Sequence, residues 1–167
     1  MIQNTSTIDG FYDFEDIYQK FVDECPDGGK LLEIGVFKGA SIIGLAQLVK
    51  ESGKNIEIWG VDDWQNNHIY NTFFANTIQQ GVTHMIKPVR APSGIAYIGF
   101  PANIFFAAFI DADHRFSAVV EDVTHYLPKV TKYLAGHDIH LPSVKLGLSK
   151  TIGNDYEVIG KSWIYEK

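Results

Sequence analysis

Segments with the apolar spacing of helices alternate along this chain with short apolar runs that are typical of strands. Residues 14–24 repeat apolar side chains every three or four positions, as an amphipathic helix does. Residues 30–34 form a short apolar run, which is typical of a strand. The same alternation predicts further helices at 40–51, 72–80, 116–127 and 144–152, and further strands at 56–61, 85–89, 104–110 and 133–135. Residues 156–159 and 163–165 lie on either side of a glycine turn, as in a closing hairpin.

Strands that alternate with helices predict an α/β fold. The nearly all-apolar run at 104–110 is typical of a central strand that is covered on both faces. Because crossovers between parallel strands are right-handed, we expect a doubly wound, Rossmann-like, mostly parallel sheet of seven strands with helices on both faces. No repeat or linker interrupts the pattern, so we expect a single domain over residues 1–167 with a short helical segment at its N-terminus.

Composition narrows the classes of partner. The chain has 167 residues, of which 46% are hydrophobic and 20% charged, as in globular proteins. Its net charge of −6 disfavours a nucleic acid held by a general basic surface. The single cysteine, Cys25, has no internal disulfide partner, which favours a reducing compartment. The chain opens without a signal pattern, and no apolar run approaches the ~20 residues that span a bilayer, so we expect a cytoplasmic protein without a membrane partner.

The most informative segment is 31–41, where a strand ends in an acid and a glycine turn leads into a helix. This arrangement is typical of a nucleotide site. A dinucleotide fingerprint would place glycine where Phe37 stands, and a P-loop would place lysine directly before Ser41. The acid, Glu33, would repel a phosphate but suits a cationic group. The segment therefore favours S-adenosylmethionine, which carries an ammonium and a sulfonium, over NAD or ATP.

Polar residues stand at the carboxyl ends of the predicted strands, where ligands bind in such sheets. Asp62 lies where an acid would bind both hydroxyls of a ribose, and Asp63 is a second candidate; a role in a turn or a helix cap is the alternative. Trp64 either covers the adenine ring or packs in the core. The candidates for cofactor binding are Glu33, Gly35, Gly39, Ser41, Asp62, Asp63, Ser93 and Asp111.

Two clusters carry the candidate chemistry, Asp111-Ala112-Asp113-His114 and Gly136-His137-Asp138. Asp111 and Asp138 would lie at adjacent strand ends and share a divalent cation, Mg²⁺ or Mn²⁺. His137 would add a nitrogen ligand, which suits Mn²⁺ better than Mg²⁺. Such a cation favours the deprotonated form of an acceptor oxygen, and Asp113 or His114 would take the proton as the catalytic base. The alternative is that these acids cap helices and the histidines make interior hydrogen bonds.

Taken together, these segments resemble class I S-adenosylmethionine-dependent methyltransferases of the methyltransferase domain 24 type. The matching segments are Gly10-Phe11-Tyr12-Asp13-Phe14, residues 32–41, Gly60-Val61-Asp62-Asp63-Trp64, residues 110–116, Gly136-His137-Asp138 and Ser162-Trp163-Ile164. The resemblance covers the whole chain and implies the strand order 3-2-1-4-5-7-6 with the last strand antiparallel. It implies cofactor binding around Glu33, Gly35 and Gly39 and by Asp62. In metal-dependent relatives, the positions of Asp111, His137 and Asp138 hold Mg²⁺ and that of Asp113 is the base.

The expected function is thus methyl transfer from S-adenosylmethionine to an oxygen of a small or carbohydrate-like acceptor. One alternative is a non-catalytic S-adenosylmethionine-binding accessory protein of a carbohydrate or secondary-metabolite pathway. Another is an NAD-dependent oxidoreductase, against which Phe37 argues. No insertion is long enough to form a lid over the acceptor, and 13% of the residues are aromatic, so we expect subunits to share apolar surface in a homodimer.

Overall fold

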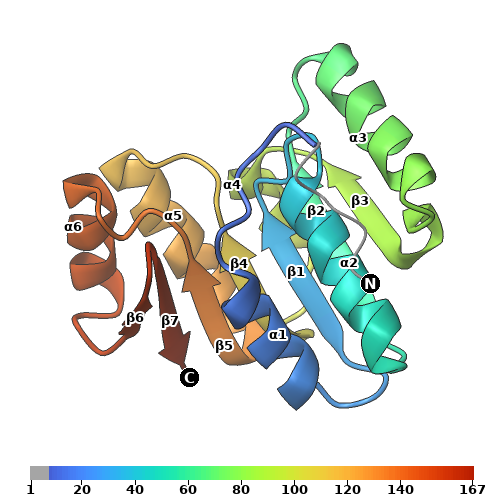
Figure 1. Cartoon of the computed structure of the whole chain (residues 1–167). Helices are drawn as coiled ribbons and strands as arrows, with labels where there is room; N and C mark the ends of the chain where they lie inside the picture. The colour runs from blue at the N-terminus through green and yellow to red at the C-terminus, as the bar shows by residue number, and fades with distance from the viewer. Residues whose placement is uncertain (1–7) are drawn as a thin grey trace.

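The computed structural model describes residues 8–167, so residues 1–7 of the predicted domain lie outside the described part. A seven-stranded sheet in the order β3-β2-β1-β4-β5-β7-β6 forms the middle layer (Figure 1). Its strands are β1 (Lys30–Ile34), β2 (Glu57–Asp62), β3 (Ile86–Arg90), β4 (Phe105–Ile110), β5 (Val130–Gly136), β6 (Glu157–Ile159) and β7 (Ser162–Glu166). The first five are parallel and β7 is antiparallel to β5, which confirms the predicted fold and strand order.

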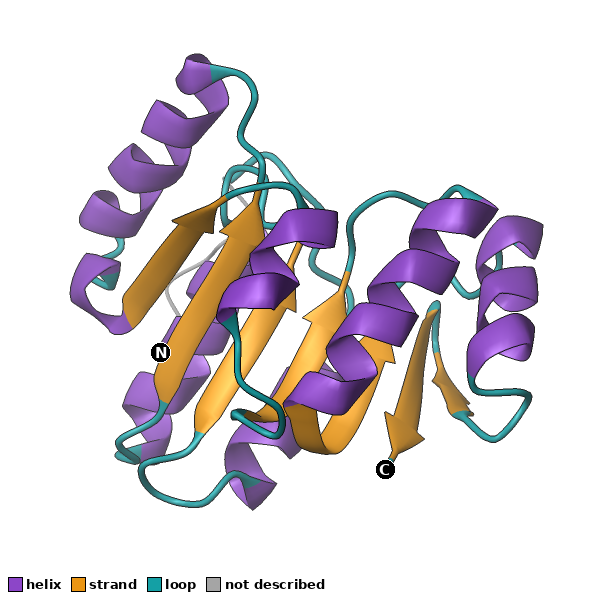
Figure 2. Cartoon of the chain, turned by 180° about the vertical axis from the view of Figure 1, so that it is seen from behind, coloured by secondary structure: helices purple, strands orange, loops and turns teal. Residues whose placement is uncertain are grey.

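Helices cover both faces of the sheet. On one face lie α1 (Glu15–Glu24) and α2 (Ala40–Ser52), and on the other lie α4 (Ser93–Ala96) and α5 (Phe116–Tyr126) (Figure 2). The helix α3 (Asn67–Gln79) flanks β3, and α6 (Pro142–Thr151) packs beside α5. Short 3₁₀ helices occupy Thr83–Met85, Tyr97–Gly99 and Leu127–Lys129. None of the described helices is long and apolar enough to cross a membrane.

The central strands are apolar on both sides because each face meets a layer of helices. Along β1, Leu31 joins the core under α1 and α2, whereas the next residue, Leu32, joins the core under α5. Along β4, Phe109 and Ile110 divide between the same two cores. Adjacent residues of a strand point to opposite faces, so an uninterrupted apolar run is what a doubly covered strand needs.

Two element boundaries differ from the sequence prediction by three residues or more, and one short helix was not predicted. α3 begins at Asn67, five residues before the predicted start, because the side chain of Asn66 caps it by accepting the N–H of His68 at 2.8 Å. β5 begins at Val130 rather than at residue 133. Its added residues include Lys132, whose Nζ lies 2.6 Å from Glu24 Oε2. The four-residue helix α4 was not predicted, because one turn is too short to show a helical period.

The parallel strands deliver their last residues to one edge of the sheet. There the end of β1 is hydrogen-bonded to the ends of both neighbouring strands, β2 and β4. The N–H of Gly35 donates to Val61 O at 2.9 Å, and the N–H of Asp111 donates to Ile34 O at 2.8 Å. The backbone hydrogen bonds of the sheet therefore continue into the loops, and these loops carry the candidate site.

Candidate functional site

A cavity of about 1300 Å³ opens at the carboxyl ends of the parallel strands. Ligand sites of doubly wound sheets lie at this edge. The predicted site residues that line it are Gly35, Ser41, Asp62, Asp63, Ser93, Asp111, Asp113, His114, His137 and Asp138. Two others, Glu33 and Gly39, are not among its described lining residues. Sequence reasoning did not single out Asp9, Phe11, Ile95, Arg115, His140 and Lys161, which also line it.

Gly35 is required by the packing of the sheet itself. Its φ is +91°, and a Cβ at this position would lie 2.1 Å from the backbone O of Asp111. The close approach of β1 to β4 therefore excludes a side chain whether or not a nucleoside is bound. Gly39 has φ +92° at the start of α2, where a Cβ would lie 2.9 Å from the ring of Phe73.

Asp62, at the end of β2, holds the turn that follows β1. Its Oδ2 accepts the backbone N–H groups of Val36 and Phe37, both at 2.9 Å, and its Oδ1 accepts the N–H of Trp64 at 2.8 Å. The carboxylate thus makes the turn contacts of the alternative interpretation while it also lines the cavity. Phe37 is kept at φ +51°, a left-handed conformation that is unfavourable for a bulky residue.

Trp64 packs in the core. It is 1% exposed, contacts the rings of Tyr70 and Phe73, and donates its indole N–H to Phe37 O at 2.7 Å. The structure therefore favours core packing over a role against the adenine ring. The neighbouring Asp63 contacts only Gln65 among the described hydrogen bonds, which leaves its carboxylate available to the cavity.

Glu33 is a buried acid beneath the cavity. Its two oxygens accept the hydroxyls of Tyr18 at 2.6 Å and of Ser41 at 2.7 Å. Burial, opposed by these two hydrogen bonds, raises the pKa of Glu33 to about 8. Ser41 lines the cavity, but its hydroxyl is already directed at Glu33. Glu33 therefore reaches the cavity through Ser41 rather than as a lining group, and its raised pKa favours the uncharged form at neutral pH, which does not support the expected attraction for a cationic group.

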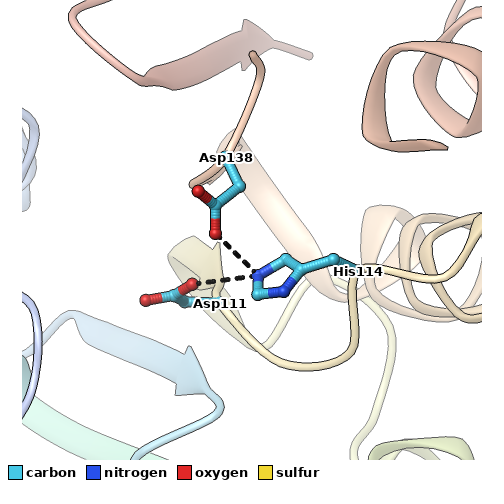
Figure 3. Close-up of side chains that lie close together, drawn as sticks. All are labelled: Asp111, His114 and Asp138. Atoms are coloured by element: carbon cyan, nitrogen blue, oxygen red, sulfur yellow. Dashed lines mark ion pairs between the residues drawn. The ribbon is translucent and has the colours of Figure 1, made fainter. Parts of the chain in front are cut away.

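Asp111, His114 and Asp138 converge at the ends of β4 and β5 (Figure 3). The Nε2 atom of His114 lies 2.9 Å from Asp138 Oδ2 and 3.5 Å from Asp111 Oδ1. Despite these distances, Nε2 is buried and has no hydrogen-bond partner within residues 8–167. The contact with Asp111 and the charge of Asp138 raise the pKa of His114, although partial burial opposes them. The site is therefore set up to receive a positive charge, which a proton or a cation would supply.

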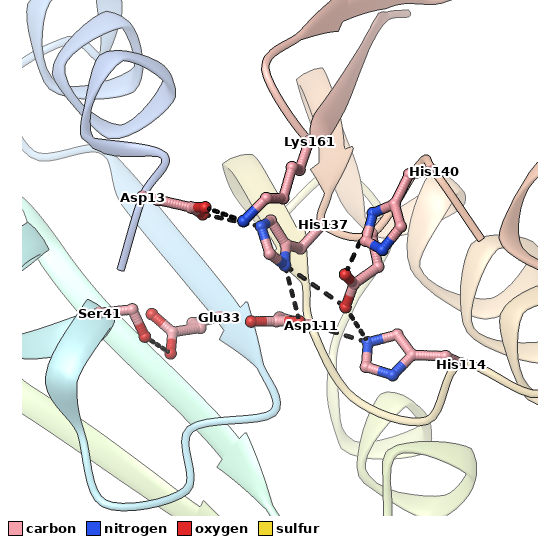
Figure 4. A network of polar contacts seen from close by, with 9 residues as sticks. Asp13, Glu33, Ser41, Asp111, His114, His137, His140 and Lys161 are labelled. Carbon is pink, nitrogen blue, oxygen red and sulfur yellow. Dashed lines mark hydrogen bonds and ion pairs between the residues drawn. The ribbon is translucent and has the colours of Figure 1, made fainter. Parts of the chain in front are cut away.

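His137 approaches the same carboxylates from the other side (Figure 4). Its Nδ1 lies 3.4 Å from Asp138 Oδ2 and 3.8 Å from Asp111 Oδ1. Its Nε2 lies 2.8 Å from Oδ1 of Asp13, whose Oδ2 accepts a hydrogen bond from Lys161 Nζ at 2.8 Å. Sequence reasoning assigned no role to Asp13 or Lys161. The available signal was that Asp13 lies in the segment 10–14, which carries the family resemblance.

Asp113 is paired with a cation. Its carboxylate accepts hydrogen bonds from the backbone N–H of Arg115 at 2.9 Å and from Arg115 Nε at 2.7 Å, and it forms an ion pair with the same guanidinium. These contacts hold the pKa of Asp113 below its usual value. A carboxylate held in this way is a weaker base than His114, which was the other candidate.

The donor set fits a divalent cation. Ligand atoms ~2.1 Å from an ion and at right angles to each other are about 3 Å apart. The carboxylate-to-imidazole distances in the cluster of Asp111, His114, His137 and Asp138 run from 2.9 to 3.8 Å. Within this cluster, Asp111, His114 and Asp138 offer ligand atoms that lie within 4.8 Å of one another. Two carboxylates with imidazole nitrogen suit Mn²⁺, Fe²⁺ or Zn²⁺ better than Mg²⁺. His114 lies beside the predicted set of Asp111, His137 and Asp138, where its Nε2 lone pair can bind the cation or accept a proton, but not both at once.

Comparison with known families identifies one match. A family model described as a methyltransferase domain matches residues 32–139, about two thirds of the chain. The matched region runs from β1 to the loop after β5, so it includes the turn after β1, Asp62 and both clusters at the ends of β4 and β5. A search of curated proteins finds no match.

Solved structures share the fold at low sequence identity. An S-adenosylmethionine-dependent O-methyltransferase from Thermotoga maritima has a TM-score of 0.70 at 12% identity, over 95% of this chain and 66% of that one. The O-methyltransferase TomG of Streptomyces achromogenes, involved in tomaymycin synthesis and solved with S-adenosylmethionine, has a TM-score of 0.67 at 14% identity, over 92% and 78%. A Clostridium thermocellum protein described as a candidate rRNA methylase has a TM-score of 0.67 at 8% identity, over 100% of both chains.

Proposed function

This chain belongs to the methyltransferase domain family and is an S-adenosylmethionine-dependent methyltransferase, and we propose that it transfers the methyl group to an oxygen of a small acceptor. The observation that carries the proposal is one continuous cavity lined both by the turn after β1 and by Asp111, His114 and Asp138. Direct transfer needs the acceptor oxygen in line with the methyl carbon and the sulfur, so donor and acceptor must share one cavity.

We assign the nucleoside to the part of the cavity that lies between β1 and β3. Asp62 and Asp63 supply carboxylates for the ribose hydroxyls, and Ser93 lines the neighbouring wall. An ionised carboxylate has about four acceptor positions, of which Asp62 uses three for backbone N–H groups. The assignment therefore gives Asp63 a larger share of the ribose than sequence reasoning did.

The acceptor is assigned to the end of the cavity at β4 and β5. His114 lies there with a buried nitrogen that has no hydrogen-bond partner among the described residues. In the proposed reaction the acceptor oxygen forms a bond to the methyl carbon as the bond from that carbon to sulfur breaks, and His114 takes the hydroxyl proton on Nε2. Asp113 is disfavoured as the base because Arg115 holds its carboxylate.

Asp111, Asp138 and His137 would hold a divalent cation beside this base. When bound, such a cation stabilises the deprotonated form of an acceptor hydroxyl at neutral pH. Without a positive charge, the two carboxylates and the lone pairs of the two imidazoles repel one another. With the cation bound, His114 would not be needed to neutralise Asp111 and Asp138 and could act on the acceptor.

The electrostatics of the cavity favour a small neutral acceptor over a nucleic acid. Its lining includes Asp9, Asp62, Asp63, Asp111, Asp113, Glu121 and Asp138. The two strong bases that line it, Arg115 and Lys161, are each paired with an acid. Phosphate binding depends on cations that are free to meet the backbone, and this cavity presents mainly carboxylates.

The test is transfer of a ¹³C-labelled methyl group from S-adenosylmethionine to a panel of small hydroxylated compounds, sugars included, with ribosomal RNA in parallel. Reactions contain Mn²⁺ or excess chelator. We expect an O-methyl carbon in the NMR spectrum of at least one small product, and transfer that chelator suppresses. Asp111→Asn should lose this transfer and keep S-adenosylmethionine affinity within a few-fold, since the two sites touch different parts of the complex.

Two results would count against the proposal. Methylation of nitrogen or of RNA alone would contradict an oxygen of a small acceptor as the target. Tight cofactor binding without transfer to any acceptor would favour a non-catalytic accessory protein. Full transfer in chelator would remove the cation but would leave the proposed role of His114 as base in place.

A further inference from the structure

Three segments that are far apart in the sequence meet around His137. Asp13 precedes α1, His137 follows β5, and Lys161 lies in the turn between β6 and β7 (Figure 4). The ring of Phe14 stacks on that of Phe109, with centroids 4.3 Å apart, and lies 5.2 Å from the ring of His137. Asp13 is therefore placed by the packing of its buried neighbour and not by an exposed chain end.

Asp13 has a single chemical role toward His137. Its ion pair with Lys161 at 2.8 Å keeps the carboxylate charged, and a charged carboxylate accepts hydrogen bonds but has no proton to donate. The proton of the bond between His137 and Asp13 must therefore be on Nε2 of the imidazole. In a neutral ring this leaves Nδ1 with its lone pair, and Nδ1 is the nitrogen that faces Asp111 and Asp138.

We infer that Asp13 is a positioning residue that fixes His137 as the Nε2–H tautomer, so that Nδ1 presents a lone pair to the cation proposed between Asp111 and Asp138. The use of Nδ1 rests on the proposed function, whereas the tautomer belongs to the metal-free protein. Metal-binding histidines commonly donate their second ring N–H to a carboxylate, and loss of that carboxylate weakens metal binding about 10–100-fold. Here the chain already contains the carboxylate at 2.8 Å from Nε2.

Lys161 allows a direct test, because it shares the side chain of Asp13 with His137. In Asp13→Asn two donors compete for the single amide oxygen, because both Lys161 Nζ and His137 Nε2–H need an acceptor. The ammonium is the stronger donor, so the oxygen should turn to Lys161 and the amide N–H₂ should face Nε2. The ring proton then moves to Nδ1, where it points at Asp111 and Asp138 and blocks the lone pair. Removing Lys161 as well, in Asp13→Asn/Lys161→Met, frees the amide oxygen and should restore the Nε2–H tautomer.

The experiment combines long-range ¹H–¹⁵N NMR of the histidine rings with Mn²⁺ titration calorimetry. The spectra are recorded on metal-free protein at a pH where His137 is neutral, and His137→Gln assigns the signals. We expect Nε2–H in the wild type, Nδ1–H with about 10–100-fold weaker Mn²⁺ binding in Asp13→Asn, and recovery of both in the double variant. Asp16→Asn, an exposed acid two residues into α1, is the matched control and should change neither.

A wild-type ring proton on Nδ1 would overturn the inference, and this result does not depend on whether any variant folds. Wild-type tautomer and wild-type Mn²⁺ affinity in Asp13→Asn would overturn it too. If the wild type binds no Mn²⁺, the cation of the proposed function and the use of Nδ1 both fall. The role of Asp13 in setting the tautomer is then confirmed or rejected by the spectra alone.

Discussion

The carboxylate of Asp62 accepts the backbone N–H of Phe37 at 2.9 Å, across 25 residues of sequence. The same oxygen accepts the N–H of Val36, and the other carboxylate oxygen accepts the N–H of Trp64. The acid predicted to bind a ribose is thus also the anchor of the turn after β1. Loss of cofactor affinity on its removal would therefore have two causes, and stability must be measured alongside binding.

Replacing Asp62 by alanine should lower both properties. Three backbone N–H groups lose their acceptor, so we expect the free energy of unfolding to fall by about 1–3 kcal/mol in urea denaturation. S-adenosylhomocysteine affinity, measured by calorimetry on the folded fraction, should fall as well. Asp63→Ala is the control for stability because its carboxylate contacts only Gln65 among the described hydrogen bonds. An Asp62→Ala protein of unchanged stability would show that the carboxylate does not hold the turn.

Gly35→Ala should destabilise the fold rather than weaken cofactor binding alone. Its Cβ would lie 2.1 Å from the backbone O of Asp111 at a φ of +91°. We expect a loss of about 2–5 kcal/mol, from backbone strain and from displacement of β4. Gly28→Ala is the matched control, because Gly28 also has a positive φ but nothing within 4 Å of its Cβ, so only about 1–2 kcal/mol should be lost. Equal losses in the two variants would refute the close approach as the cause.

Glu33 should make stability fall as pH rises. Its pKa is raised by burial from 4.5 to about 8 in the folded protein, so the folded state binds its proton more tightly than the unfolded state. The contribution of Glu33 to the free energy of unfolding is complete below pH 4.5. It is lost progressively as pH rises from 4.5 to about 8. Urea denaturation at several pH values should show a steeper fall for the wild type than for Glu33→Gln, whose amide can still bond both hydroxyls.

The exposed acid Glu51 supplies the control for this pH dependence. Glu51→Gln should reproduce the wild-type slope, because the side chain lies on the surface of α2. If Glu33→Gln also reproduced it, the buried acid would not be the source of the slope. Titration of His114, whose pKa is also raised, contributes in the same direction and is common to all three proteins.

Substitution of His114 should lower the rate of methyl transfer much more than substitution of Asp113. Removal of a general base lowers the rate about 100-fold or more. Once an acceptor is known, the rate of methyl transfer by His114→Gln should therefore be lower than that of the wild type by at least this factor. The rate of Asp113→Asn should stay within a few-fold of the wild-type rate, because Arg115 already holds the Asp113 carboxylate. Initial rates with ¹³C-methyl donor, together with S-adenosylhomocysteine affinity as a control for folding, give the comparison. The opposite order of effects would return the role of base to Asp113.

Most helices and strands were predictable from local patterns. The range of β1 was predicted to the residue, because a short apolar run between glycine turns has one consistent interpretation. The start of α3 was missed because it depends on the side-chain cap from Asn66 and not on apolar period. Strand order came from the resemblance, since periodicity says which segments are strands but not which strands are neighbours.

The gathering of the candidate residues at one edge of the sheet was predictable from the sequence, whereas most of their contacts were not. Strand ends placed Asp111 and Asp138 at one edge, and the structure brings both to His114. The contact from Asp13 to His137 spans 124 residues, and no local pattern reveals it. The pairing of Asp113 with Arg115 spans two residues and was visible in principle, because aspartate commonly bonds the backbone N–H two positions on.

The most direct measurement is a crystal structure of the protein with S-adenosylhomocysteine and Mn²⁺, with anomalous scattering recorded to locate the ion. We expect an anomalous peak between the carboxylates of Asp111 and Asp138, with Nδ1 of His137 as a ligand. We also expect the nucleoside in the same cavity, beside Asp62 and Asp63, with its sulfur facing the acceptor end. Bound S-adenosylhomocysteine with only water between Asp111 and Asp138 would contradict the cation, and a nucleoside bound outside this cavity would contradict the placement of donor and acceptor in one cavity.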